Sequence, residues 1–171
     1  YNGAPSITKE IKNDENNQWA VAGDHQIGAT VEFRIIATLP ESIIGYKNYR
    51  YNIEEDYTKW FTSNNDVTVK INDTENELSS EYYTVDYYDG CFYVKVDLPK
   101  AVKAGVLQLS DQLYIYYTAK LNSNATTDRF NSNYSSVAYS IIDNGRNWEQ
   151  SPNTFSRTYT YEVNASNVSA G

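Results

Sequence analysis

The chain has 171 residues, enough for one large domain or two small ones. Its formal net charge of −8 argues against a nucleic-acid-binding protein and against binding to an anionic membrane surface, because both partners need lysine and arginine to neutralise them. The single cysteine, Cys91, excludes an intrachain disulfide, and we expect it to be a half-buried free thiol in a strand.

Tyrosine, which occurs 17 times, and frequent Val, Ile and Thr residues favour β-strands over helices. Apolar and polar residues alternate in many segments, as in 30–39, and a period of two predicts strands. In chain order, the predicted strands cover residues 7–11, 30–39, 46–57, 67–71, 82–88, 91–96, 112–121, 133–142 and 154–163. The predicted fold is therefore all-β, an antiparallel β-sandwich of Greek-key type with about nine strands.

Short polar segments separate the predicted strands. Asp89-Gly90 has the composition of a tight hairpin turn. Only residues 99–107 and 56–61 are expected to hold short turns of helix. Since no repeat or linker divides the chain, we predict one domain over residues 1–165 and a tail over 166–171. A signal peptide and an apolar membrane-spanning run are both lacking, and we interpret the chain as a piece of a longer protein.

Three polar side chains lie in the apolar phase of their strands. Lys9 lies between Ile7 and Ile11, Glu55 continues an alternating run of apolar residues, and Asn133 begins another. Alternate residues of a strand share one face. We therefore predict that Lys9, Glu55 and Asn133 point toward the core.

A lysine, a carboxylic acid and a carboxamide in one interior are the components of a self-formed Lys–Asn amide bond. Burial is expected to lower the pKa of Lys9 and to raise that of Glu55, so that the pair can exchange a proton and become neutral. The free amine can then attack the carboxamide carbon of Asn133, while Glu55 polarises the amide and helps ammonia to leave. Each molecule reacts once, so the chain is not expected to be a turnover enzyme.

Each of these residues also has a simpler interpretation. A strand lysine usually extends its ammonium group to solvent, and a strand asparagine is often a hydrogen-bonded or edge residue. On the residues alone, these interpretations stay open beside the crosslink.

Several segments, in their order and spacing, resemble a known family. They are 7–11, 28–35, 39–40, the tyrosine-rich run 45–55, and the strands 113–121 and 133–140. Over about residues 6–163 the chain resembles the fimbrial isopeptide-formation D2 domain of sortase-assembled pilins and other wall-anchored surface proteins of Gram-positive bacteria. The resemblance implies an Ig-like (Cna-type) β-sandwich.

The resemblance also implies roles for individual residues. Lys9 and Asn133 fall at the positions of the bond-forming pair, and Glu55 falls at the position of the catalytic acid. The family commonly has aspartate at that position, with a small residue after it and a glycine further on, where this chain has glutamate and Trp60. Asp56 is the alternative acid, although strand phase directs it outward.

The implied function is that of a stalk domain in a pilin or cell-surface adhesin, outside the cell in the wall or pilus. Its expected partners are other domains or subunits of the same fibre, with sortase acting on parts outside this chain. No sorting signal of the Leu-Pro-x-Thr-Gly type and no Tyr-Pro-Lys pilin motif is present. We expect no cofactor, no nucleic acid and no membrane among its partners.

The main alternative is a ligand-binding module, either carbohydrate-binding or the ligand-binding head of an adhesin. Trp19, Trp60 and Trp148 are candidates for a flat aromatic platform that binds sugar, although aromatic residues in an all-β domain more often belong to the core. The acidic loops at 13–17 and 64–66 lack the regular ligand spacing of a calcium loop. With His25 as the only histidine, neither a zinc site nor a histidine-based catalytic triad is expected.

Overall fold

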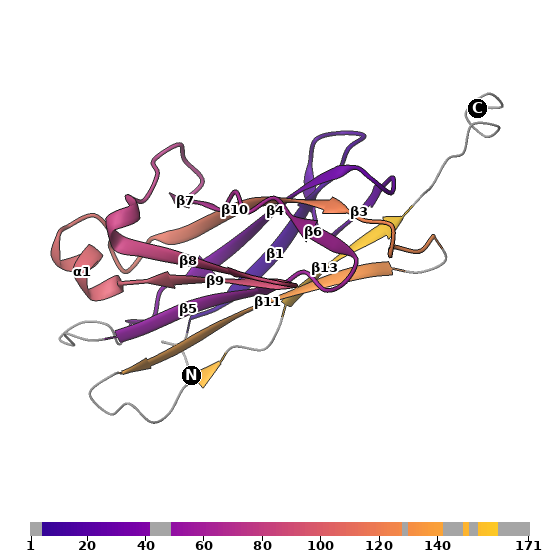
Figure 1. The fold of residues 1–171 in the computed structure, drawn as a ribbon. Helices are drawn as coiled ribbons and strands as arrows, with labels where there is room; N and C mark the ends of the chain where they lie inside the picture. Colours follow the sequence, from indigo (N-terminus) through magenta and orange to yellow (C-terminus); the bar gives the residue numbers. More distant parts are fainter. Residues whose placement is uncertain (1–4, 42–48, 128–129, 142–148, 151–153, 161–171) are drawn as a thin grey trace.

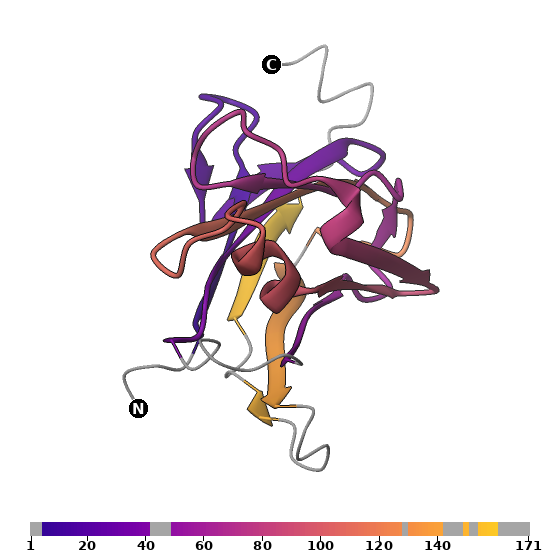
Figure 2. The same cartoon turned by 90° about the vertical axis from the view of Figure 1, so that its left-hand side faces the viewer.

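The computed structural model describes residues 5–41, 49–127, 130–141, 149–150 and 154–160. They form two β-sheets that face each other (Figures 1 and 2). The first sheet has the order β2-β1-β4-β10-β6, and β7 also pairs with β10. The second has the order β3-β13-β11-β5-β9-β8, and β12 also pairs with β11. The predicted all-β sandwich is confirmed.

The strands of the first sheet are β1 (Ile7–Lys12), β2 (Trp19–Ala20), β4 (Thr30–Thr38), β6 (Phe61–Ser63), β7 (Thr68–Ile71) and β10 (Gln112–Leu121). Those of the second sheet are β3 (Ala22–His25), β5 (Tyr49–Asp56), β8 (Tyr83–Tyr88), β9 (Cys91–Val96), β11 (Phe130–Ile141), β12 (Glu149–Gln150) and β13 (Thr154–Thr160).

Each of the predicted strands has a counterpart in the structure, but the predicted number was too low. The described residues form thirteen strands, and the additional ones, β2, β3, β6 and β12, have two to four residues each. Two to four residues are too few to show an alternation of apolar and polar side chains. One pairing also departs from the antiparallel expectation, because β13 and β3 run parallel.

Some predictions fall on residues outside the described ranges. These are the first residues of the strand predicted from Tyr46, the last residues of those predicted to Ile142 and Val163, and the boundary between the domain and its tail at residues 165 and 166. The single domain therefore stays a prediction.

The helix predicted at 99–107 is α1 (Leu98–Lys103), at one end of the sandwich (Figure 1). The side chain of Asp97 caps its start by accepting a hydrogen bond from the backbone N–H of Lys100 at 3.2 Å. Gly105, with a φ of 75°, follows its end. Leu98 and Ala101 are fully buried, so the helix closes that end of the core.

The helix predicted at 56–61 is wrong. Asp56 ends β5, the next residues form a turn, and Phe61 begins β6. Thr58 has a φ of 59°, a left-handed conformation that cannot continue a right-handed helix. The structure also contains a 3₁₀ turn, η2 (Ser80–Tyr82), that was not predicted.

The core lies between the two sheets and follows the alternation of the sequence. In β10, every second residue from Leu113 to Leu121 is buried. The predicted hairpin is present as well, since Tyr88 pairs with Cys91 across Asp89 and Gly90, and Gly90 has a φ of 88°. Among the described residues, no helix is long and apolar enough to span a membrane.

Candidate functional site

Lys9 lies in β1 with its side chain buried between the sheets. Its ammonium is placed there because Ile7, Lys9 and Ile11 share the core face of the strand. The Lys9 Nζ contacts the Glu55 carboxylate and donates a hydrogen bond to the Tyr117 hydroxyl at 2.8 Å. Lys9 Nζ also lies 5.0 Å from the centre of the Phe33 ring. Phe33 belongs to β4, the strand between β1 and β10. The lysine therefore does not extend to solvent.

Glu55 approaches from the opposite sheet, on the core face of β5, and is fully buried. Its Oε1 atom contacts Lys9 Nζ and accepts a hydrogen bond from the Tyr117 hydroxyl at 2.7 Å. Its Oε2 atom accepts one from the hydroxyl of Ser135, the direct cross-strand neighbour of Glu55 on β11. Both carboxylate oxygens therefore have partners.

Asn133 lies two residues before Ser135 on β11, on the same buried face. Its Nδ2 donates a hydrogen bond to the Tyr117 hydroxyl at 3.2 Å. Lys9 Nζ and Asn133 Nδ2 contact the same hydroxyl oxygen. The distance between the two nitrogens therefore cannot exceed the sum of their hydrogen bonds to Tyr117, 2.8 Å and 3.2 Å. The structure thus brings all three predicted site residues into one buried cluster.

Burial shifts the pKa values of this cluster. Removal from water lowers the pKa of Lys9 from 10.5 to about 8, against the opposing attraction of Glu55. The same desolvation raises the pKa of Glu55, although Lys9, Ser135 and Tyr117 favour its carboxylate form. Burial, followed by the nearby Glu55 charge, raises the pKa of Tyr117 well above its ordinary value. Each shift favours the neutral form of its group.

Sequence reasoning did not assign two members of the cluster, Tyr117 and Ser135. Both lie in core phase on predicted strands, which was the available signal for their burial. Their contacts with Glu55 depend on which strands pair and on how the two sheets face each other, and no local pattern reports either.

The remaining candidate residues lie elsewhere. Asp56 is exposed on the opposite face of β5 from Glu55, and its Oδ1 accepts the backbone N–H of Thr58 at 2.9 Å, so it is not the buried acid. Cys91 is half-buried, as predicted, and not in a disulfide. His25 is buried with its Nδ1 2.9 Å from Asp14. In the described part of the chain, no group of three or more His, Cys, Asp or Glu side chains is arranged to hold a metal ion.

The aromatic platform finds little support. Trp19 is partly buried, and the Arg34 guanidinium lies 4.5 Å from its ring centre. Trp60 packs against the core with the Lys59 ammonium 4.8 Å from its ring. Trp148 lies outside the described residues. A ring that is partly buried and covered by a cation offers a sugar only part of its face.

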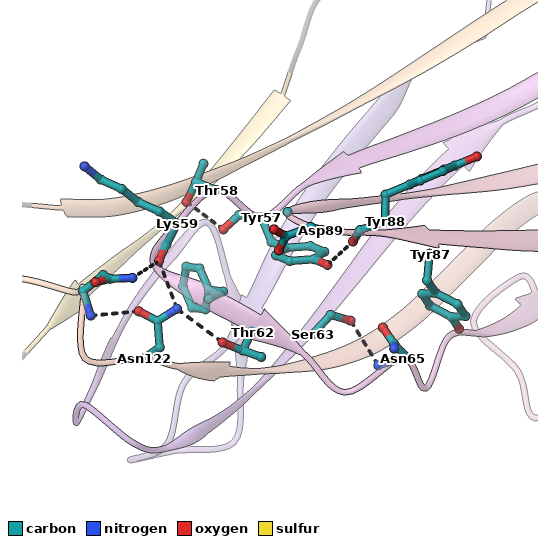
Figure 3. Close-up of a pocket in the computed structure, with 13 residues that line it drawn as sticks. Tyr57, Thr58, Lys59, Thr62, Ser63, Asn65, Tyr87, Tyr88, Asp89 and Asn122 are labelled. Atoms are coloured by element: carbon teal, nitrogen blue, oxygen red, sulfur yellow. Dashed lines mark hydrogen bonds between the residues drawn. The ribbon is translucent and has the colours of Figure 1, made fainter.

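A surface groove of about 510 Å³ shares no lining residue with the buried cluster (Figure 3). It is lined by residues 57–59, 61–63, 65, 87–90, 122 and 124. Its amides are largely engaged within the protein: Asn122 Nδ2 donates to the Lys59 carbonyl at 2.9 Å and to Thr62 Oγ1 at 3.3 Å (Figure 3). No lining residue is a tryptophan, so this groove is not the predicted platform.

No family model matches the chain, and no curated protein does. Solved structures do match. The major pilin subunit BcpA of Bacillus cereus superposes with a TM-score of 0.70 at 13% identity, over 91% of this chain and 40% of that one. The 35 kDa C-terminal fragment of the Streptococcus agalactiae major pilin GBS80 gives 0.71 at 17%, over 91% and 56%.

The T6 backbone pilin of serotype M6 Streptococcus pyogenes gives a TM-score of 0.62 at 18% identity, over 92% of this chain and 36% of that one. This chain therefore spans between about a third and three fifths of the pilin chains it resembles. It has the fold of a major-pilin domain. These neighbours confirm the predicted Ig-like sandwich, whereas membership of the D2 isopeptide family stays a prediction.

Proposed function

We propose that the chain is a structural stalk domain of a Gram-positive pilin or cell-surface adhesin, stabilised by an intramolecular Lys9–Asn133 isopeptide bond that forms with the help of Glu55. The observation that carries the proposal is the buried cluster. An amine, a carboxylic acid and a carboxamide from three strands and both sheets meet at one hydroxyl, in a fold otherwise found in major pilins.

The burial of the cluster supports the chemistry. An ammonium ion has no lone pair with which to attack a carbonyl, so Lys9 must first lose a proton. Glu55 is the adjacent acceptor, and the desolvation that lowers the pKa of Lys9 raises that of Glu55. Transfer of the proton converts the buried ion pair into a neutral amine and a neutral acid, which costs less in a dry interior than separated charges.

The proposed bond then forms by acyl transfer. Lys9 Nζ attacks Cγ of Asn133, the new N–C bond forms, and the Cγ–Nδ2 bond breaks to release ammonia. Glu55 polarises the carboxamide oxygen as a proton donor and holds the proton that Lys9 gave up. The fold supplies proximity, which lowers the barrier for a reaction that is very slow between free amines and amides. Each chain undergoes the step once.

The proposed partners follow from the fold rather than from the cluster. As a stalk module, the chain would join other domains or subunits of one fibre on the cell surface. Sortase would act on parts of the parent protein outside this chain.

Intact-mass measurement of the denatured full chain tests the proposal. We expect a mass lower than the sequence mass by one ammonia, and a crosslinked peptide pair that contains Lys9 and Asn133 in tandem mass spectrometry. Lys9→Ala and Asn133→Ala should each restore the unmodified mass, after allowance for the substitution.

Lys12→Ala is the matched control, because Lys12 is on the same strand but partly exposed. Its chain should still lose ammonia. A wild-type chain of full sequence mass would overturn the crosslink and leave only the pilin-like fold. Screening on a glycan and matrix-protein array separates the stalk from the alternative ligand-binding module, since a stalk domain should bind nothing tightly.

A further inference from the structure

The Tyr117 hydroxyl uses its full hydrogen-bonding capacity on the three residues of the cluster. A phenol has one proton to donate and two lone pairs that accept. Tyr117 donates to Glu55 Oε1 at 2.7 Å, and it accepts from Lys9 Nζ at 2.8 Å and from Asn133 Nδ2 at 3.2 Å. Its single hydroxyl therefore contacts Lys9, Glu55 and Asn133 at once.

Isopeptide formation requires a second proton transfer, in addition to the one from Lys9 to Glu55. The attacking amine and the carboxamide nitrogen each start with two hydrogens. In the products, Nζ of the new amide carries one hydrogen and the released ammonia carries three. One proton must therefore pass from Lys9 Nζ to Asn133 Nδ2, and these are the two nitrogens that share the Tyr117 oxygen.

We propose that Tyr117 is a catalytic residue of the self-crosslinking reaction, whose hydroxyl relays a proton from Lys9 Nζ to Asn133 Nδ2. This inference rests on the proposed function. After Nζ has bonded to Cγ of Asn133, the hydroxyl oxygen takes the surplus proton of Nζ as its own proton passes to Nδ2. The Cγ–Nδ2 bond breaks, ammonia leaves, and Tyr117 is a neutral phenol again.

The state of Glu55 frees the hydroxyl for this task. Before the reaction, the Tyr117 proton is directed to the Glu55 carboxylate. Once Lys9 has protonated Glu55, the acid has a proton of its own and Oε1 needs none from Tyr117. The phenol proton can then turn toward Asn133 Nδ2, by rotation about the C–O bond alone.

The ring of Tyr117 is held in place for a relay. It stacks on Phe33 and lies nearly perpendicular to the ring of Phe92, with ring centres 5.0 Å apart in each pair. The residue is also buried. Burial, followed by the adjacent Glu55 charge, raises the pKa of Tyr117 well above its ordinary value and so favours the neutral phenol. Tyr117 therefore acts by passing protons on, and it does not act as a phenolate.

Tyr117→Phe tests the relay because it removes the hydroxyl and keeps the ring contacts. Full chains are made in a short pulse of cell-free synthesis, chased, quenched in acid and followed by intact mass for loss of ammonia. General acid–base groups contribute about a hundredfold or more to rate, so we expect at least about a hundredfold slower crosslinking. Tyr51→Phe is the matched control, since Tyr51 is equally buried and its hydroxyl donates to the Thr38 carbonyl at 2.7 Å, away from the cluster.

A second measurement separates proton relay from simple packing. Wild-type crosslinking should slow in D₂O relative to H₂O, while folding followed by tryptophan fluorescence in the same solvents should not account for the difference. Crosslinking of Tyr117→Phe at the wild-type rate, or a wild-type reaction without this solvent isotope effect, would overturn the relay. The isotope measurement needs no variant, so it holds even where Tyr117→Phe fails to fold. A wild-type chain that loses no ammonia would instead contradict the proposed function itself.

Discussion

Burial acts on the two members of the Lys9–Glu55 pair in opposite directions. It lowers the pKa of the amine to about 8 and raises the pKa of the acid, so both shifts lead toward uncharged groups. Ser135 and Tyr117 counter this on the acid side by donating hydrogen bonds to the carboxylate. Burial thus favours the neutral pair, whereas these hydrogen bonds favour the ion pair.

The Lys9 shift predicts a pH dependence of stability in Asn133→Ala, which cannot form the amide. Between pH 8 and 10.5, Lys9 binds a proton in the unfolded chain but has released it in the folded one. The free energy of unfolding contributed by this group therefore rises with pH through that window. Equilibrium denaturation at a series of pH values measures it.

Tyrosines titrate in the same pH range. The contribution of Lys9 is therefore obtained as the difference in unfolding free energy between Asn133→Ala and a reference variant. The reference is the triple variant Asn133→Ala, Lys9→Met, Glu55→Gln, which has the same tyrosines without the buried pair. A difference of a few kcal/mol that grows toward pH 10.5 is expected. A difference that stays constant with pH would show that Lys9 is not held with a lowered pKa.

Glu55 itself tests the geometry at the acid position. Glu55→Asp restores the residue common in the resembled family but shortens the side chain by one methylene. The present carboxylate reaches Lys9 and Tyr117 with one oxygen and Ser135 with the other, and a shorter side chain on the same strand cannot keep all three contacts. We expect slower ammonia loss in the pulse-chase assay. Glu54→Asp, one residue earlier and outside the cluster, should react at the wild-type rate.

At the level of elements, the alternation of the sequence was sufficient for the long strands. The buried residues of β4, β5 and β10 follow a period of two without interruption, because each strand has one face on the core. The short strands β2, β3, β6 and β12 have no such period. The parallel pairing of β3 with β13 joins segments that are distant in sequence, so it depends on the assembled sandwich.

The same division applies to the site. Strand phase predicted that Lys9, Glu55 and Asn133 would be buried, and the structure buries them. That they meet depends on the register of β5 with β11 and on the facing of β1 and β10 from the other sheet. Tyr117 could not be assigned a role for this reason, since the period of β10 makes it look like any other core tyrosine.

The β8–β9 hairpin gives an element-scale prediction. Gly90 has a φ of 88°, and a Cβ added there would have no atom within 4 Å. Gly90→Ala should therefore cost backbone strain without a clash, about 1 kcal/mol of unfolding free energy. Denaturant unfolding in the Asn133→Ala background measures it. Asp89→Ala in the same turn should cost less, and a neutral Gly90→Ala would contradict the left-handed turn.

At the scale of the whole molecule, the proposed bond connects the two sheets as well as two distant parts of the chain. Lys9 belongs to the first sheet and Asn133 to the second. A crosslink that closes a loop of roughly a hundred residues contributes about 5 kcal/mol in the loop-entropy model. Asn133→Ala should lose stability of that order, seen as a lower denaturant midpoint.

The control for that comparison is a second variant that lacks the bond for a different reason. Glu55→Gln, which should fold without forming the bond, is expected to resemble Asn133→Ala in midpoint. Addition of a reducing agent should leave the wild-type midpoint unchanged, since the only cysteine is unpaired and an amide is not reducible. Equal midpoints for wild type and both variants would remove the crosslink as a source of stability.

The position of Lys9 on the first described strand has a mechanical consequence. In a fibre under tension, a load that enters before β1 and leaves after β11 would pass through the amide, and the chain between the two residues would carry none of it. The Asp89-Gly90 turn and the residues that line the surface groove lie in this part of the chain, between Lys9 and Asn133. If the proposed bond forms, these segments can change in length and sequence without weakening the covalent path between β1 and β11.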